Sequence, residues 1–157
     1  MSYSSVGVAV TAAISFRPYS ALDREACLVL FDANCPQFFA ANERGDYEAF
    51  LDHDPQGYEV ALAASRVVGA YGLTIKLTGN HRLNWILVDP NVRGLGIGST
   101  MMSRVVAQAS ALGLKRIEIA ASHLSAPFFA RFGAIMVAET EHGWGPGMHR
   151  HDMELVL

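Results

Sequence analysis

An arginine and three glycines at every second position, Arg93, Gly94, Gly96 and Gly98, are the residues of this sequence best suited to chemistry. The apolar run before them ends at Val88–Pro90, because proline has no N–H for a ladder and restricts the residue before it. A helical pattern begins after them. Glycine lets a backbone come close to a ligand, and the unpaired N–H groups and the dipole of a helix N-terminus favour an anion. The stretch therefore predicts a phosphate-binding turn between a strand and a helix.

Two common phosphate-binding patterns do not fit this turn. A P-loop needs a lysine before its Ser or Thr to reach the terminal phosphates, and here Gly98 precedes Ser99. A dinucleotide fingerprint needs G-x-G-x-x-G directly after a strand, but here the spacing is G-x-G-x-G and five residues separate Val88 from Gly94. The turn therefore indicates a phosphate-containing ligand other than those bound by a P-loop or a dinucleotide fingerprint.

Alternating and helical hydrophobic patterns predict the elements that position this turn. Strands are expected at residues 14–17, 58–64, 67–76, 82–88, 117–120, 134–140 and 151–157. Helices are expected at residues 21–33, 46–53, 97–112 and 126–132. The strand–helix–strand segment 82–120 is a βαβ unit, which predicts two parallel strands joined by a right-handed crossover. We expect one α/β domain over residues 1–157, with residues 1–12 loosely ordered.

Two of these elements carry specific expectations about packing. The first long helix should bury one apolar face, made of Leu22, Ala26, Val29, Leu30 and Ala33. The last two strands should be joined by the glycine-rich loop 143–147. This loop carries Trp144, which either covers a site as a lid or packs the loop onto the sheet.

The composition narrows the class of protein. A net charge of −3 argues against a nucleic-acid-binding protein. The six histidines include no pair at i, i+4 and there is no Cys-x-x-Cys, which argues against a metal site. Cys27 and Cys35 are expected to be free thiols of a cytoplasmic protein. The apolar stretch from Val6 to Ile14 is too short to span a membrane, which takes about 20 residues.

With these patterns in place, the chain resembles the GNAT N-acetyltransferase superfamily over roughly Ser15 to Leu157. Its specific feature is Arg93-Gly94-Leu95-Gly96-Ile97-Gly98, which matches the family's pyrophosphate loop R/Q-x-x-G-x-G/A. Residues 87–90 look like the end of the family's fourth strand, and residues 125–134 look like its later helix. The resemblance implies an α/β fold with a mostly antiparallel, mixed sheet, in which a central parallel pair of strands splays apart to admit CoA.

The resemblance implies acetyl transfer from acetyl-CoA to a primary amine of a small molecule or peptide. The backbone N–H of Val88 would stabilise the oxyanion of the tetrahedral intermediate. Such a site needs no covalent nucleophile, so neither cysteine is required. The residues that would bind CoA are Leu87, Val88, Arg93, Gly94, Leu95, Gly96, Ile97, Gly98, Ser99, Ser125, Phe128 and Phe129.

Two departures from the family leave the proton chemistry open. The later helix has Phe129 where the family often has a tyrosine that protonates the departing thiolate. The fourth strand, residues 82–87, lacks the glutamate that often serves as general base. We expect His123, which follows the fifth strand, to be the base. Weaker candidates are His142, Glu118 and Asp89.

The sequence leaves three further alternatives. Phe38 and Phe39 are either core anchors or the wall of an acceptor pocket. The chain is either an enzyme or a non-catalytic acyl-CoA-binding sensor or scaffold of the same fold, which Phe129 and the missing fourth-strand carboxylate would favour. Neither the acceptor amine nor the oligomeric state follows from the sequence, although homodimers are common in the family.

Overall fold

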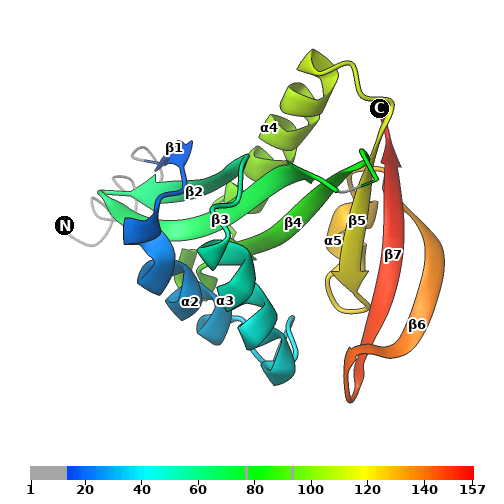
Figure 1. The fold of residues 1–157 in the computed structure, drawn as a ribbon, viewed down its shortest axis with the longest axis horizontal. Helices are drawn as coiled ribbons and strands as arrows, with labels where there is room; N and C mark the ends of the chain where they lie inside the picture. The colour runs from blue at the N-terminus through cyan, green and yellow to red at the C-terminus, as the bar shows by residue number, and fades with distance from the viewer. Residues whose placement is uncertain (1–13, 77, 93) are drawn as a thin grey trace.

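The computed structural model describes residues 14–76, 78–92 and 94–157 (Figure 1). The expectations for residues 1–12 and for Arg93 lie outside the described residues. The strands are β1 (Ile14–Pro18), β2 (Tyr58–Ala63), β3 (Arg66–Ile75), β4 (His81–Val88), β5 (Arg116–Ser122), β6 (Ile135–Gly145) and β7 (Met148–Val156). The α-helices are α2 (Arg24–Ala33), α3 (Arg44–Asp52), α4 (Ile97–Ala111) and α5 (Ala126–Ala130), and the 3-10 helices are η1 (Ala21–Asp23), η2 (Ala41–Glu43) and η3 (Pro90–Val92).

The strands form one seven-stranded sheet in the order β1-β2-β3-β4-β5-β7-β6. All neighbours are antiparallel except β4 and β5, which are parallel and pair only at Arg82–Glu118 and Leu83–Ile119. Beyond Leu83 the two strands diverge, and Figure 1 shows β5 set apart from β4. The mixed sheet with a splayed parallel pair confirms the predicted fold class.

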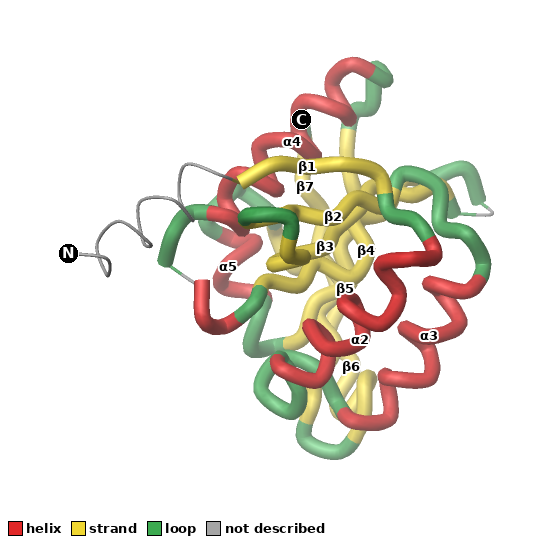
Figure 2. The backbone as a smooth tube through the Cα atoms, turned by 90° about the vertical axis from the view of Figure 1, so that its left-hand side faces the viewer, coloured by secondary structure: helices red, strands yellow, loops and turns green. Residues whose placement is uncertain are grey.

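The helices cover the sheet on both faces. In Figure 2, α4 and α5 lie on one side of the strands and α2 and α3 on the other. Each layer buries its own core. Burial of Ile97, Met101 and Val105 gives α4 the expected apolar face, whereas Phe31 and Tyr47 anchor the core beneath α2 and α3.

A bulge in β4 shapes the centre of the sheet. Ala70 pairs with Leu87, but Gly72 already pairs with Asn84, so two residues of β4 oppose one of β3. Trp85 adopts a φ of 44° inside this bulge, and its carbonyl accepts a hydrogen bond from the Tyr58 hydroxyl at 2.6 Å. The bulge thereby places the Trp85 ring in the core beneath α2 and α3.

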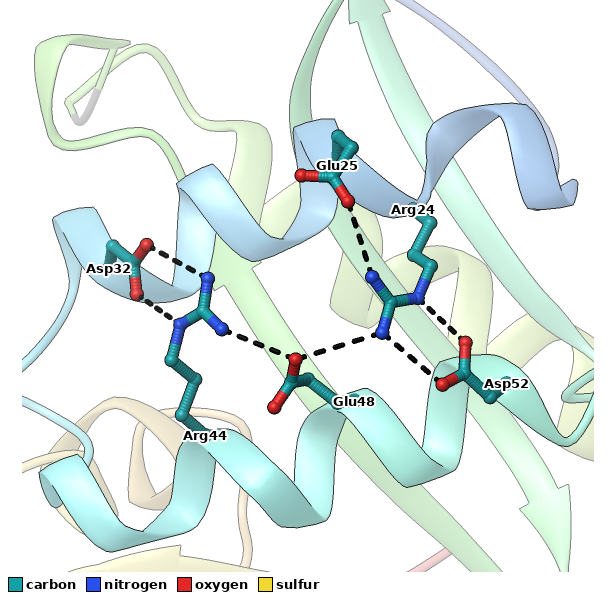
Figure 3. Close-up of polar contacts among 6 residues, drawn as sticks. All are labelled: Arg24, Glu25, Asp32, Arg44, Glu48 and Asp52. Carbon is teal, nitrogen blue, oxygen red and sulfur yellow. Dashed lines mark hydrogen bonds and ion pairs between the residues drawn. The ribbon is translucent and has the colours of Figure 1, made fainter.

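Charged side chains join α2 to α3 at two places (Figure 3). Arg24 pairs with Asp52 at 2.6 Å and Arg44 pairs with Asp32 at 2.9 Å. Glu48 lies between the two arginines, 3.7 and 3.3 Å away. The network is half-exposed, so its contribution is to the relative placement of the two helices more than to the free energy of unfolding.

Two expectations about these elements are wrong. Leu22 and Val29, expected in the apolar face of the first helix, are 96% and 65% exposed. The buried face of α2 contains Cys27, Leu28, Leu30 and Phe31 instead. The last hairpin also extends further than expected, because β6 runs to Gly145 and leaves only a tight turn before Met148.

Candidate active site

A cavity of about 770 Å³ passes between β4 and β5 where the two strands diverge. Its walls include residues of both helical layers. On the α4 and α5 side they include Gly96, Ser99 and Phe128, and on the α2 and α3 side they include Phe39 and Glu43. The cavity therefore reaches through the sheet, which would let two molecules meet from opposite faces.

The glycine turn forms one part of this cavity. Gly94 and Gly96 have φ values of 85° and 80°, a conformation that side chains rarely adopt. Gly96 directly precedes the 15-residue helix α4, whose first N–H groups have no acceptor within the helix. A Cβ atom at Gly98 would lie 3.2 Å from the Phe128 ring. The turn thus suits an anion that needs backbone N–H groups and no intervening side chains.

The backbone of Val88 faces the gap between the strands. Asp89 donates its N–H to the Val68 carbonyl at 2.8 Å, and Val88 pairs with Gly69. Since bonded and non-bonded pairs alternate in an antiparallel ladder, the N–H and C=O of Val88 point away from β3, toward β5. The side-chain amide of Asn34 donates to the Val88 carbonyl at 3.1 Å and to the Leu30 carbonyl at 2.8 Å.

Most residues predicted to bind CoA lie in the cavity wall. Leu87 does not, because its side chain is 1% exposed in the core beneath α2 and α3. Leu95 is 43% exposed at the surface, and Arg93 lies outside the described residues. The residues that line the cavity are Val88, Gly94, Gly96, Ile97, Gly98, Ser99, Ser125, Phe128 and Phe129.

His123, the expected base, lies away from the cavity wall as far as the described residues define it. Its Nδ1 accepts a hydrogen bond from the His149 backbone N–H at 3.2 Å. A neutral imidazole whose Nδ1 accepts carries its proton on Nε2. His123 therefore has no ring nitrogen ready to take a proton while this bond is in place.

The weaker base candidates have other partners. The carboxylate of Glu118 binds Lys76 at 2.7 Å, and this contact lowers its pKa. Asp89 pairs with Arg66 at 3.0 Å and also accepts the Asn91 backbone N–H, as a turn residue does. The Nδ1 of His142 accepts the Gly147 backbone N–H at 2.7 Å. In these contacts each side chain acts as a structural group.

Glu43 is a carboxylate in the cavity wall that the sequence interpretation missed. It is 4% exposed, and its Oε2 accepts the backbone N–H of Ala40 at 2.7 Å. Burial raises the pKa of Glu43 to about 7; the Ala40 hydrogen bond opposes this rise and the charge of Asp46 adds to it. In the sequence Glu43 has only the signature of a glutamate near a helix start, so no signal distinguishes it from a capping residue.

Aromatic rings form the wall around Glu43. Phe38 and Phe39 both line the cavity, and Phe39 also stacks on Trp85 with ring centroids 5.8 Å apart. Trp144 lines it as well, but its Nε1 donates to the Ala121 carbonyl at 2.8 Å and its own carbonyl accepts from Asn42 at 2.7 Å. Phe39 thus belongs to both the core and the cavity, Phe38 lines the cavity, and Trp144 is held across β5.

The cavity wall offers no thiol nucleophile and no hydroxyl at position 129. Cys27 and Cys35 are free, and burial raises the pKa of the Cys27 thiol to about 12. The ring of Phe129 is 3% exposed and cannot donate a proton. Neither cysteine nor Phe129 therefore offers a nucleophile or a proton donor in this cavity.

Across residues 14–76, 78–92 and 94–157, no three His, Cys, Asp or Glu side chains are grouped so that they could hold a metal ion. Within the same ranges, no helix combines the length and apolar character needed to cross a membrane.

Comparisons with known proteins agree with this geometry. The model of the acetyltransferase (GNAT) family matches residues 27–134. Ard1 from Thermoplasma volcanium has a similar fold, with a TM-score of 0.78 at 16% identity over 92% of this chain and 98% of that one. Ribosomal-protein-alanine N-acetyltransferase from Brucella melitensis gives 0.71 at 18% identity, over 91% of this chain and 99% of that one.

A third similar structure contains CoA. Rv2747 from Mycobacterium tuberculosis, solved in complex with CoA and NLQ, gives a TM-score of 0.69 at 20% identity over 91% of this chain and 99% of that one. No curated protein matches the chain in sequence. Because the family model spans well over half of the 157 residues, the chain belongs to the acetyltransferase (GNAT) family.

Proposed function

We propose that this protein transfers an acetyl group from acetyl-CoA to a primary amine of a small molecule or peptide. The observation that carries the proposal is the cavity through the β4–β5 gap, which has the glycine turn on one side of the sheet and the aromatic wall around Glu43 on the other. Membership of the GNAT family and the CoA bound by Rv2747 support a CoA thioester as the donor. The donor and the acceptor would then enter from opposite faces.

The donor half of the reaction uses backbone groups. The N–H groups of residues 94–99 would bind the pyrophosphate at the start of α4, and the gap beyond Leu83 would take the pantetheine arm. The N–H of Val88 would donate to the thioester oxygen as it becomes an oxyanion. Direct attack by the amine through a tetrahedral intermediate needs no acyl-enzyme, which agrees with the buried thiol of Cys27.

The proposal is tested by incubating the protein with acetyl-CoA and a panel of primary amines. We expect mass spectrometry to find a product heavier by one acetyl group for at least one amine, with formation of free CoA in equal amount. Calorimetry with CoA alone should show binding. Acetyl-CoA consumed only at the rate of the protein-free control, for every amine, would contradict the proposal.

A non-catalytic acyl-CoA sensor is the second candidate. Phe129 favours it, because this side chain cannot protonate a departing thiolate. A thiolate is nevertheless a good leaving group near neutral pH, so water could supply the proton. Tight CoA binding together with no turnover across the whole panel would favour the sensor, and one amine with turnover would exclude it.

Replacement of Asn34 by leucine tests the role given to Val88. The Val88 and Leu30 carbonyls would lose a buried donor, so the free energy of unfolding should fall by about 1–3 kcal/mol. With the backbone of Val88 less firmly held, we expect kcat to fall roughly tenfold or more, by analogy with the loss of one oxyanion donor, while the Kd for CoA stays nearly constant. Steady-state kinetics and calorimetry separate the two effects. An unchanged kcat would show that Asn34 does not position the Val88 backbone for the reaction.

A further inference from the structure

Glu43 is a nearly buried carboxylate in the cavity wall, whereas His123, the base expected from the sequence, lies outside the wall that the described residues form. We infer that the Glu43 carboxylate binds the ammonium group of the acceptor and takes its proton, which makes Glu43 a catalytic residue. The inference rests on the proposed acetyl transfer and names its acceptor as a primary ammonium compound. β4 carries no carboxylate, and the Nδ1 of His123 already accepts the His149 backbone N–H.

The geometry leaves one carboxylate oxygen for the acceptor. Glu43 ends η2 on the α2 and α3 side of the sheet and lines the cavity with a side chain that is almost wholly buried. Its Oε2 is held by the Ala40 N–H. Among the described residues, the hydrogen bond to this carboxylate comes from Ala40 and goes to Oε2, not to Oε1. The bond to Oε2 thus fixes the carboxylate, and no residue of the described ranges competes with a ligand for Oε1.

The charges around Glu43 leave it without a cationic partner in the described part of the chain. Burial raises the pKa of Glu43 most strongly, and the negative charge of Asp46 on α3 raises it further. Of the arginines in the cavity wall, Arg150 on β7 binds Asp152 at 2.9 Å and Arg82 on β4 lies 3.9 Å from Glu118. Arg131, also in the cavity wall, lies over the Phe128 ring. Cys35 is a titratable neighbour, because burial and then the charges of Asp32 and Glu43 raise the pKa of its thiol. The other groups on the neighbouring elements are Arg44, which binds Asp32 and Glu48, and His142 and Tyr47.

The surroundings of Glu43 favour a positively charged ligand. A nearly buried carboxylate such as Glu43, which pairs with no cation of the described residues, is stabilised when an ammonium group enters beside it. The rings of Phe38, Phe39 and Trp85 in the same wall would contact the apolar part of the acceptor, and their faces attract a positive charge. The acceptor would therefore carry its primary ammonium group on an apolar or aromatic segment.

The proton steps balance as follows. Glu43 takes one proton from R–NH3⁺, which leaves R–NH2 and a neutral carboxylic acid. The amine nitrogen forms a bond to the thioester carbonyl carbon, and the C–S bond breaks to release the CoA thiolate. The nitrogen loses a second proton as the amide forms, and the thiolate gains one. The acid form of Glu43 returns its proton to water.

Glu43→Gln tests the inference directly. The glutamine keeps an oxygen that can accept the Ala40 N–H, so the fold and the Kd for CoA should be retained. We expect kcat to fall by about 10²- to 10⁴-fold, as for the loss of a general base. The wild-type kcat/KM should rise with pH through the pKa of Glu43, about 7, because only the carboxylate form accepts a proton. This rise should be absent from Glu43→Gln.

Asp46→Asn is the matched variant. Asp46 is exposed, and loss of its negative charge should lower the pKa of Glu43, so the rise in kcat/KM should move to lower pH with the plateau retained. A Glu43→Gln protein that binds CoA and turns over at the wild-type rate would overturn the inference and leave acetyl transfer intact. A pH profile that Asp46→Asn does not move would also count against it. If the wild-type protein acetylated none of the amines, the proposed function itself would be wrong.

Discussion

Replacement of Gly96 by aspartate is expected to weaken CoA binding at least a hundredfold, a loss of about 3 kcal/mol. Gly96 has a φ of 80°, so any side chain there strains the turn that precedes α4. An aspartate would also place a carboxylate where the N–H groups of the helix should meet pyrophosphate. Its charge would repel the ligand and its oxygens would compete for the same donors. Calorimetry with CoA measures the effect.

Gly79→Asp is the control for this substitution. Gly79 has a φ of 88° and open space around it, as Gly96 does, but it lies in the turn between β3 and β4 and outside the cavity wall. Its aspartate should strain the backbone to a similar degree without affecting the Kd for CoA. Gly96→Ala separates strain from charge and should show an intermediate loss. Equal CoA affinities for wild type and Gly96→Asp would show that the pyrophosphate site is elsewhere.

The largest effect on stability is expected from Gly72→Ala. A Cβ atom there would lie 2.7 Å from both the Gly57 carbonyl oxygen and the Tyr58 Cα. These are backbone atoms, so relief would require β2 and β3 to separate next to the bulge that holds Trp85. We expect the free energy of unfolding to fall by about 4 kcal/mol or more, the range of exceptional core substitutions. Chemical denaturation gives the value.

Gly45→Ala is the matched substitution for this test. Gly45 lies inside α3 with nothing within 4 Å of its added Cβ, so the alanine should stabilise the protein by about 0.5–1 kcal/mol through helix propensity. The two variants should therefore shift the denaturation midpoint in opposite directions. If Gly72→Ala is as stable as wild type, the close approach of β2 and β3 at this position is wrong.

The parts of the fold that sequence patterns predict well are those with one dominant local signal. The period of Ile97, Met101 and Val105 predicts the buried face of α4, and the left-handed Gly113 ends the helix as expected. The βαβ pattern predicts the parallel pairing of β4 with β5. In each case the local pattern and the tertiary packing select the same conformation.

Sequence patterns do not predict the parts of the fold in which tertiary packing decides between similar local patterns. Two overlapping helical faces run along α2, and the aromatic cluster of Phe31, Tyr47 and Trp85 selects the face that contains Phe31. The sequence of β4 alone does not predict the bulge at Trp85 either, because the bulge depends on how β4 pairs with β3. Pattern analysis treats each segment alone and so cannot choose among such packings.

The candidate site also has one part that the sequence predicts and another that it does not. The glycine turn carries its chemistry in consecutive residues, so the sequence alone predicts its place in the cavity wall. Glu43 and Asn34 matter through contacts with residues far from them in the chain, such as the bond from Asn34 to Val88. A lone glutamate near a helix start gives no sign that it will be buried in a cavity with a pKa of about 7.

The most direct test of acetyl transfer by this protein is amine-dependent release of free thiol from acetyl-CoA, followed in parallel for wild type and Gly96→Asp. We expect at least one primary amine to accelerate thiol release by the wild-type protein. We also expect that Gly96→Asp, although folded, does not release thiol above the protein-free rate at the same acetyl-CoA concentration. Equal thiol release by the two proteins, or none by wild type with any amine, would contradict these expectations.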